Sequence, residues 1–88
     1  MDEMSEKLKV VKKLVDKFQL PGVCGFLVLP FRDHDVQVIL VIDLNWTKKI
    51  QARADHIGKG MRNIVKKKLE SYLGFEVSVG SMGVNECN

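Results

Sequence analysis

The chain has 88 residues, of which 45% are hydrophobic and 28% are charged, and its net charge is +3. This length accommodates one domain, and the hydrophobic content excludes an intrinsically disordered chain. No apolar run approaches the roughly 20 residues of a membrane helix, and the charged N-terminus is unlike a secretory signal peptide. We therefore expect one domain over residues 1–88, with an ordered core at about 5–81, in a cytoplasmic protein without a membrane partner.

The first half of the chain predicts one helix and two strands. Apolar residues at three- and four-residue spacing predict an amphipathic helix over residues 4–18. Pro21 and Gly22 fit the centre of a type II turn. Residues 23–29 and 36–43 predict two strands of an antiparallel hairpin, the first ended by Pro30. Because residues 23–29 are apolar on both faces, we expect that strand to be central in a sheet or covered.

The second half predicts a helical stretch over residues 47–73 and a strand over residues 75–81. Asn45 or Thr47 can cap the start of the helical stretch, and Gly74 can end it in the left-handed conformation. The tail from residue 82 onward either frays or extends the strand. The fold class is therefore α+β, with two layers and a three-stranded sheet that carries helices on one face. The expected order is helix, strand, strand, helix (or helix, turn, helix) and strand.

Gly58 and Gly60 allow two interpretations of the helical stretch. In the first, residues 47–57 and 62–73 are separate helices joined by a turn over residues 58–61, because each glycine weakens a helix by about 1 kcal/mol relative to alanine. In the second, residues 47–73 form a single helix, because the apolar stripe keeps its phase across the glycines. One of the glycines then allows close approach to the sheet or to a partner helix.

Residues 57–64, with the sequence IGKGMRNI, resemble the signature of KH domains. In that family an Ile-Gly-x-x-Gly turn joins two helices and holds a single-stranded nucleic-acid backbone. The type II members have the order helix, strand, strand, helix, turn, helix, strand. The resemblance implies that Gly58 and Gly60 let the nucleic-acid backbone approach while Lys59 and Arg62 face phosphates. Met61 stands where the family has its second glycine.

Basic residues are concentrated in the same part of the chain. Between Lys48 and Lys68 there are eight Lys and Arg residues and one acid, whereas the remaining residues sum to −4. Such a segment favours an anionic partner, with Lys48, Lys49, Lys66 and Lys67 as supporting charge. The alternative is a solvated helix face that keeps the protein soluble.

No pattern of catalytic residues is present in the sequence. Asp33, His34 and Asp35 read as a polar hairpin loop rather than a metal site, and Asp43 reads as a residue at an element boundary. Cys24 and Cys87 are expected to be two unpaired thiols. We therefore expect no enzyme activity, no cofactor and no metal.

Two functional hypotheses follow from these observations. The first is a small module that binds RNA or another single-stranded nucleic acid, with Gly58, Lys59, Gly60 and Arg62 at the nucleic-acid backbone. The second is a protein-interaction or homodimerisation domain without a nucleic-acid role, which uses the uncovered face or an edge of its sheet. A turn at residues 58–61 favours the first hypothesis, and an unbroken helix favours the second.

Overall fold

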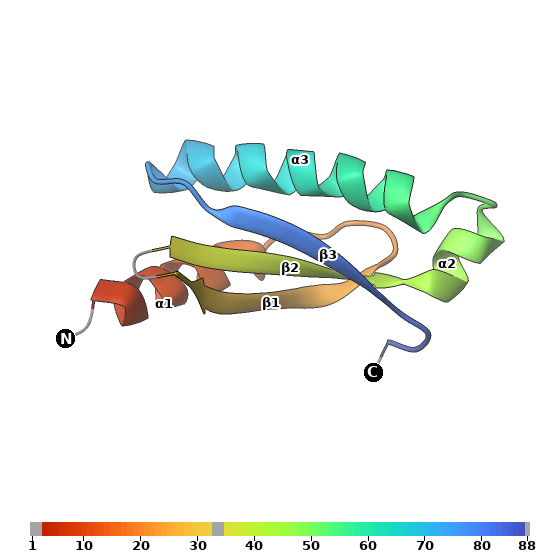
Figure 1. Cartoon of the computed structure of the whole chain (residues 1–88), viewed down its shortest axis with the longest axis horizontal. Coiled ribbons are helices and arrows are strands. Elements are labelled where there is room, and N and C mark those ends of the chain that lie inside the picture. Colours follow the sequence, from red (N-terminus) through yellow and green to blue (C-terminus); the bar gives the residue numbers. More distant parts are fainter. Residues whose placement is uncertain (1–2, 33–34, 88) are drawn as a thin grey trace.

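The computed structural model describes residues 3–32 and 35–87. Its elements, in chain order, are α1 (Glu3–Val15), β1 (Val23–Phe31), β2 (Asp35–Asp43), α2 (Leu44–Lys49), α3 (Ala54–Leu73) and β3 (Ser78–Val84). The order of helices and strands confirms the predicted α+β class (Figure 1). Asp33 and His34 of the predicted polar loop lie outside the described residues.

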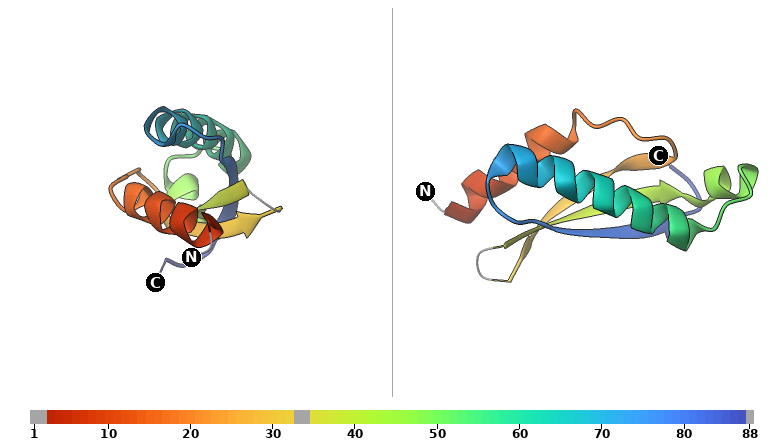
Figure 2. Two further views of the ribbon diagram at one scale, coloured as in Figure 1. Left: turned by 90° about the vertical axis from the view of Figure 1, so that its left-hand side faces the viewer. Right: turned by 90° about the horizontal axis from the view of Figure 1, so that it is seen from above.

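The sheet is mixed, with the spatial order β1-β2-β3. β1 and β2 form the predicted antiparallel hairpin, whereas β3 runs parallel to β2. A parallel neighbour requires a crossover connection, which α2 and α3 provide. α1 and α3 lie on the same side of the sheet, and no helix of the described residues covers its other face (Figure 2).

The core lies between the two layers. Alternate residues of the central strand β2 point toward the helices, and Val36, Val38, Leu40 and Ile42 are at most 3% exposed. They pack with buried residues of both long helices, namely Val11, Val15, Val65 and Leu69. The other residues of β2 must therefore point to the uncovered face of the sheet.

The central position expected for the first strand is wrong, and the alternative of a covered strand holds only for the face toward the helices, where Val28 is 9% exposed. β1 is an edge strand rather than a central one, and it continues through Pro30 to Phe31. Proline is tolerated there because an edge strand has hydrogen-bond positions that need no partner. The apolar character of both faces of β1 is therefore not explained by burial within this chain.

The predicted break in the helical stretch is also misplaced. Residues 58–61 lie inside α3, which runs unbroken from Ala54 to Leu73, so the predicted turn at these residues is wrong. The single helix from residue 47 is wrong as well, because the chain turns between α2 and α3 at residues 50–53. Gln51 has φ 56° in this turn, a left-handed value that nothing in its residue type announces.

Several local predictions at element ends are confirmed and one is corrected. Gly22 has φ 73° in the turn before β1, and Gly74 ends α3 in the left-handed conformation. The cap of α2 is Asp43, whose carboxylate accepts a hydrogen bond from the backbone N–H of Asn45 at 2.9 Å. Asn45 and Thr47 are thus inside α2, and the Thr47 hydroxyl donates to the carbonyl of Leu44 instead.

The last strand begins three residues later than predicted and ends at Val84. Its parallel pairing with β2 starts at Ser78, opposite Gln37. Val77, which the alternating pattern placed in the strand, is buried in the connection from α3. The tail thus extends the strand, so that Met82 and Val84 become part of the sheet.

The expectation of two unpaired thiols is wrong. Cys24 and Cys87 form a disulfide, and their Cα atoms are 5.5 Å apart, an ordinary separation for such a bond. The prediction failed because the sequence separation of 63 residues hid the return of the tail to β1. The cytoplasmic expectation can therefore no longer draw on unpaired cysteines.

None of the helices within residues 3–32 and 35–87 has both the length and the apolar character needed to cross a membrane.

Candidate functional site

The residues predicted to grip a nucleic-acid backbone are divided between two sides of α3. Gly58 is buried against β3, where an added Cβ would lie 2.9 Å from the Ser81 hydroxyl oxygen. The guanidinium of Arg62, one helical turn later, donates a hydrogen bond to the same hydroxyl. Lys59 and Gly60 are exposed. Gly58 and Arg62 therefore hold α3 to the sheet, which is the close approach that the second interpretation predicted.

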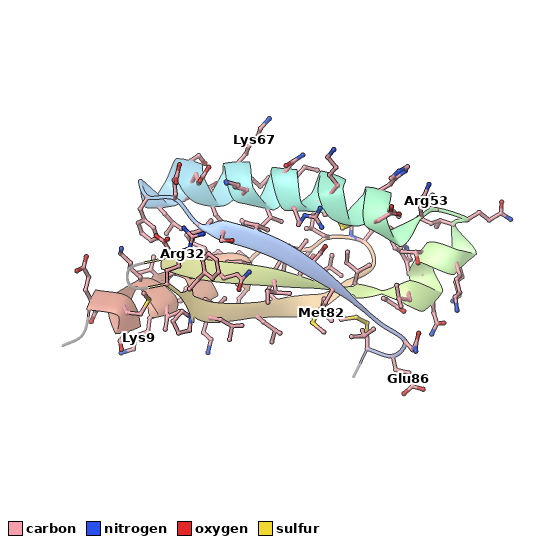
Figure 3. The ribbon with its side chains drawn as sticks, viewed as in Figure 1. Lys9, Arg32, Arg53, Lys67, Met82 and Glu86 are labelled. Carbon is pink, nitrogen blue, oxygen red and sulfur yellow. A yellow bond between two sulfur atoms is a disulfide. The ribbon has the colours of Figure 1, made fainter. Side chains whose placement is uncertain are left out.

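The predicted supporting lysines are all exposed but do not converge on one point. Lys48 and Lys49 lie in the last turn of α2, whereas Lys66 and Lys67 lie in the second half of α3. Lys59 and Lys66 are seven residues apart on the helix, or about 10 Å along its axis. Lys67 and Arg53 point away from the sheet (Figure 3). The result is a basic surface that spans α2 and α3 rather than a compact cluster.

The N-terminus of α3 already holds an acid. Arg53 precedes the helix, and its guanidinium lies 3.2 Å from the Asp55 carboxylate in an exposed ion pair. Partial desolvation alone would raise the pKa of Asp55, but the charge of Arg53 and nearby backbone N–H groups outweigh it and lower the pKa. The N–H groups at this helix end therefore face a carboxylate of the chain itself.

The sequence predicted an uncovered face of the sheet but did not reveal which residues lie on it. Cross-strand pairing places Leu27, Leu29, Ile39, Val41, Met82 and Val84 on this face, which we call the open face. Leu27 and Met82 are each 44% exposed and Leu29 is 41% exposed. The sequence feature that pointed to this face was the apolar character of both faces of β1. It predicted that both faces are covered, but it did not show that the described residues cover only one of them.

The open face is uncharged in its interior. Its rows across the sheet are Leu29, Gln37 and Ser78, then Leu27, Ile39 and Gly80, then Gly25, Val41 and Met82. The acids Asp35 and Asp43 lie only at the two ends of β2. Each row carries its large side chain on one edge strand and a glycine or serine on the other.

The C-terminal tail borders one end of the open face. After β3, Asn45 donates a side-chain hydrogen bond to the carbonyl of Asn85 at 2.6 Å, and Cys87 is bonded to Cys24 beside β1. A hollow of about 230 Å³ lies here, with Gly25, Leu27, Val41 and Val84 on the sheet side and Glu86 and Cys87 on the tail side. Met82 and Glu86 lie on the side of the sheet away from α3 (Figure 3).

A second hollow, of about 540 Å³, lies between the end of α1 and the start of β1. Phe18, Leu20 and Phe26 contribute its apolar wall, and Asp16 contributes a carboxylate. Among the described residues, no group of three or more His, Cys, Asp or Glu side chains is placed to hold a metal ion.

The chain matches no family model, no curated protein and no solved structure. Its function is therefore inferred from its own fold and surfaces.

Proposed function

We propose that this protein is a non-catalytic interaction domain that pairs with a second copy of itself through the open face. The observation that carries the proposal is the exposure of Leu27, Leu29 and Met82, at 41–44% each, on a face that none of the helices within the described residues covers. An apolar patch of this kind on a sheet is typical of a protein interface. Packing of two sheets face to face is an established way to bury such a patch.

The charge of the chain favours a second copy over a partner that needs charged contacts. Each copy carries a net charge of +3, because the segment from Lys48 to Lys68 has eight basic residues and one acid while the remaining residues sum to −4. The interior rows of the open face have no charged side chain, so in a pair of copies like charges can meet only at the ends of β2, at Asp35 and Asp43.

The rows of the open face are also complementary to themselves. A two-fold axis parallel to β2 places β1 of one copy over β3 of the other, which is the reciprocal contact of a symmetric dimer. Leu27 of each copy then lies over Gly80 of its partner, and Met82 lies over Gly25. An added Cβ at Gly25 would meet no atom within 4 Å, so there is room for the incoming methionine.

The variant Leu27→Lys/Met82→Lys tests this proposal by sedimentation velocity over a concentration series. We expect the wild-type chain to dimerise and the variant to bind itself more than about 100-fold more weakly, because each copy would bury unpaired ammonium groups.

The matched control for this variant is Ile64→Lys. Ile64 is 49% exposed but lies on α3, on the other side of the sheet, so its replacement should leave the dimer unchanged. A wild-type chain that stays monomeric at its highest soluble concentration would refute the proposal.

Nucleic-acid binding remains the second candidate, and the turn between α2 and α3 favours it. The element order is that of the type II KH domains, with the turn at residues 50–53 in place of 58–61. Lys48 and Lys49 precede this turn and Arg53 is its last residue, and all three are exposed. Exposed cations beside a turn between two helices suit contact with phosphates, although the turn contains no glycine to admit a nucleic-acid backbone closely.

Titration of labelled single-stranded RNA at two salt concentrations tests the second candidate. Binding should weaken with salt, by a slope of about 0.7 per phosphate contact, and Lys48→Glu/Lys49→Glu should reduce both the affinity and the slope. Lys12→Glu/Lys13→Glu on α1 makes the same change of charge at exposed positions away from the turn. Equal losses in the two variants would mean that only net charge matters, and the second candidate would then fail.

A further inference from the structure

We infer that the disulfide between Cys24 and Cys87 controls pairing of the open face by holding the C-terminal tail as one wall of the hollow that receives Met82 of the second copy. This inference rests on the proposed function. It adds a redox dependence that neither the fold nor the exposed leucines imply.

The position of the tail follows from the topology of the sheet. Val84 ends β3 at one edge, and Cys87 is bonded to β1 at the other edge, so the three residues after Val84 must pass β2. Two strand spacings amount to about 9.5 Å. The Cα atoms of Cys24 and Cys87 are 5.5 Å apart and the chain bends at Asn85, so the segment need not be fully extended, but the disulfide keeps its end beside β1.

The disulfide is the main constraint on this segment. Asn85, Glu86 and Cys87 are all exposed, so none of them is anchored by burial. The hydrogen bond from Asn45 to the Asn85 carbonyl fixes only the first of the three. Without the disulfide, the wall formed by Glu86 and Cys87 has no covalent attachment to β1.

The position of Glu86 and Cys87, which form the wall, relates the tail to the proposed dimer contact. The hollow that it closes contains Gly25, the position over which Met82 of a second copy lies in the two-fold arrangement. Cys24 sits at the irregularity of β1, where the pairing with β2 shifts between Val23 and Gly25. The disulfide thus joins the tail to the part of β1 that forms the floor of the hollow.

Reduction by a dithiol gives a balanced route between two states. A thiolate of the dithiol attacks the sulfur of Cys87, a residue that is exposed, the bond to Cys24 breaks, and the Cys24 thiolate takes up a proton. The second thiol of the dithiol then attacks the reductant sulfur of the mixed disulfide. The two reductant sulfurs form an intramolecular disulfide, and Cys87 is released and takes up a proton to become a thiol. Two electrons pass from the dithiol to the protein, and the tail is freed.

The test compares the oxidised chain with the chain in a dithiol reductant by sedimentation and by ¹⁵N relaxation. On reduction we expect the heteronuclear NOE of Asn85, Glu86 and Cys87 to fall. We also expect the dimer to dissociate about tenfold more readily, because each of the two hollows that receive Met82 loses the contact with the tail. Amide spectra of β2 and α3 should keep their dispersion, which establishes that both forms are folded.

Cys87→Ser is the matched control, since it keeps the tail but cannot be oxidised to a link with Cys24. It should behave like the reduced wild-type chain, with or without the reductant. Equal or tighter pairing of the reduced wild-type chain would overturn the role of the disulfide and leave the open-face dimer standing. Failure of the oxidised and the reduced chain alike to pair would instead overturn the proposed function, and the role of the disulfide with it.

Discussion

Two glycines of one helix have different physical roles, although they are separated by a single residue. Gly58 faces β3 at a point where a methyl group would press on the Ser81 hydroxyl, and that hydroxyl also accepts the hydrogen bond from Arg62. Gly60 faces solvent, with no atom within 4 Å of an added Cβ. Only the first is required by packing between helix and strand.

The variants Gly60→Ala and Gly58→Ala should therefore differ in sign. Alanine at residue 60 should raise the free energy of unfolding by up to about 1 kcal/mol, because it lowers the backbone entropy of the unfolded chain and meets no obstacle. Alanine at residue 58 gains the same propensity but displaces Ser81, so we expect no stabilisation or a net loss. Urea unfolding measures both values, and a stabilisation of equal size in both variants would contradict the packing described for Gly58.

The role of a single residue could not be predicted where it depends on a contact with a residue distant in the sequence. The motif at residues 57–64 contains nothing that reveals Ser81, so a helix-packing glycine and a backbone-gripping glycine look the same. Gly22 and Gly74 were predictable because local backbone conformation alone requires them, at φ 73° and 72°. Asp43 was predicted only as a residue at an element boundary, and its role as the cap of α2 was assigned instead to Asn45 or Thr47.

At the scale of elements, periodicity identified each long segment but not how the segments pair. α1, β2 and the hairpin follow from apolar spacing, and all are present close to their predicted bounds. β3 was placed three residues early because Phe75, Val77 and Val79 alternate, whereas pairing with Gln37 of β2 sets its first residue at Ser78. Strand register is a tertiary property, so alternation alone does not fix it.

The turn between α2 and α3 was missed for a different reason. Residues 50–53, with the sequence IQAR, contain neither glycine nor proline, and the apolar stripe passes through them. The chain turns there because Gln51 adopts a left-handed conformation and the Ala52 N–H bonds to the Thr47 carbonyl at 3.0 Å. Gly58 and Gly60, seven and nine residues after Gln51, led the turn to be predicted in the wrong place.

At the scale of the whole molecule, the two faces of the sheet differ in kind. One is sealed by α1 and α3, and the other presents apolar side chains, with the tail held by a disulfide at one end. The molecule is elongated, with extents of 45 × 24 × 23 Å, so the open face of the sheet is large for a chain of this size. Small domains bury a low fraction of their surface, and the proposed pairing through such a face would increase that fraction.

The candidate site could be predicted only in outline from the sequence. The uncovered face of a three-stranded sheet was named as a contact surface, but Leu27, Leu29 and Met82 were not. Their identification required knowing that β1 is an edge strand and that the tail from Met82 joins β3. The basic segment could be recognised from the distribution of charged residues along the sequence. That Gly58 and Arg62 face the sheet while Lys59 and Gly60 face solvent could be seen only once α3 was known to be one continuous helix.

Isotope-filtered NOE spectroscopy on a mixture of labelled and unlabelled copies tests the central claim most directly. The two-fold arrangement predicts contacts from the methyl groups of Leu27 in one copy to the α protons of Gly80 in the other, and from Met82 to Gly25. The same spectra should show no intermolecular contact from Ile64 on α3. Dimers whose intermolecular contacts arise from α3, with none from the open face, would contradict the account.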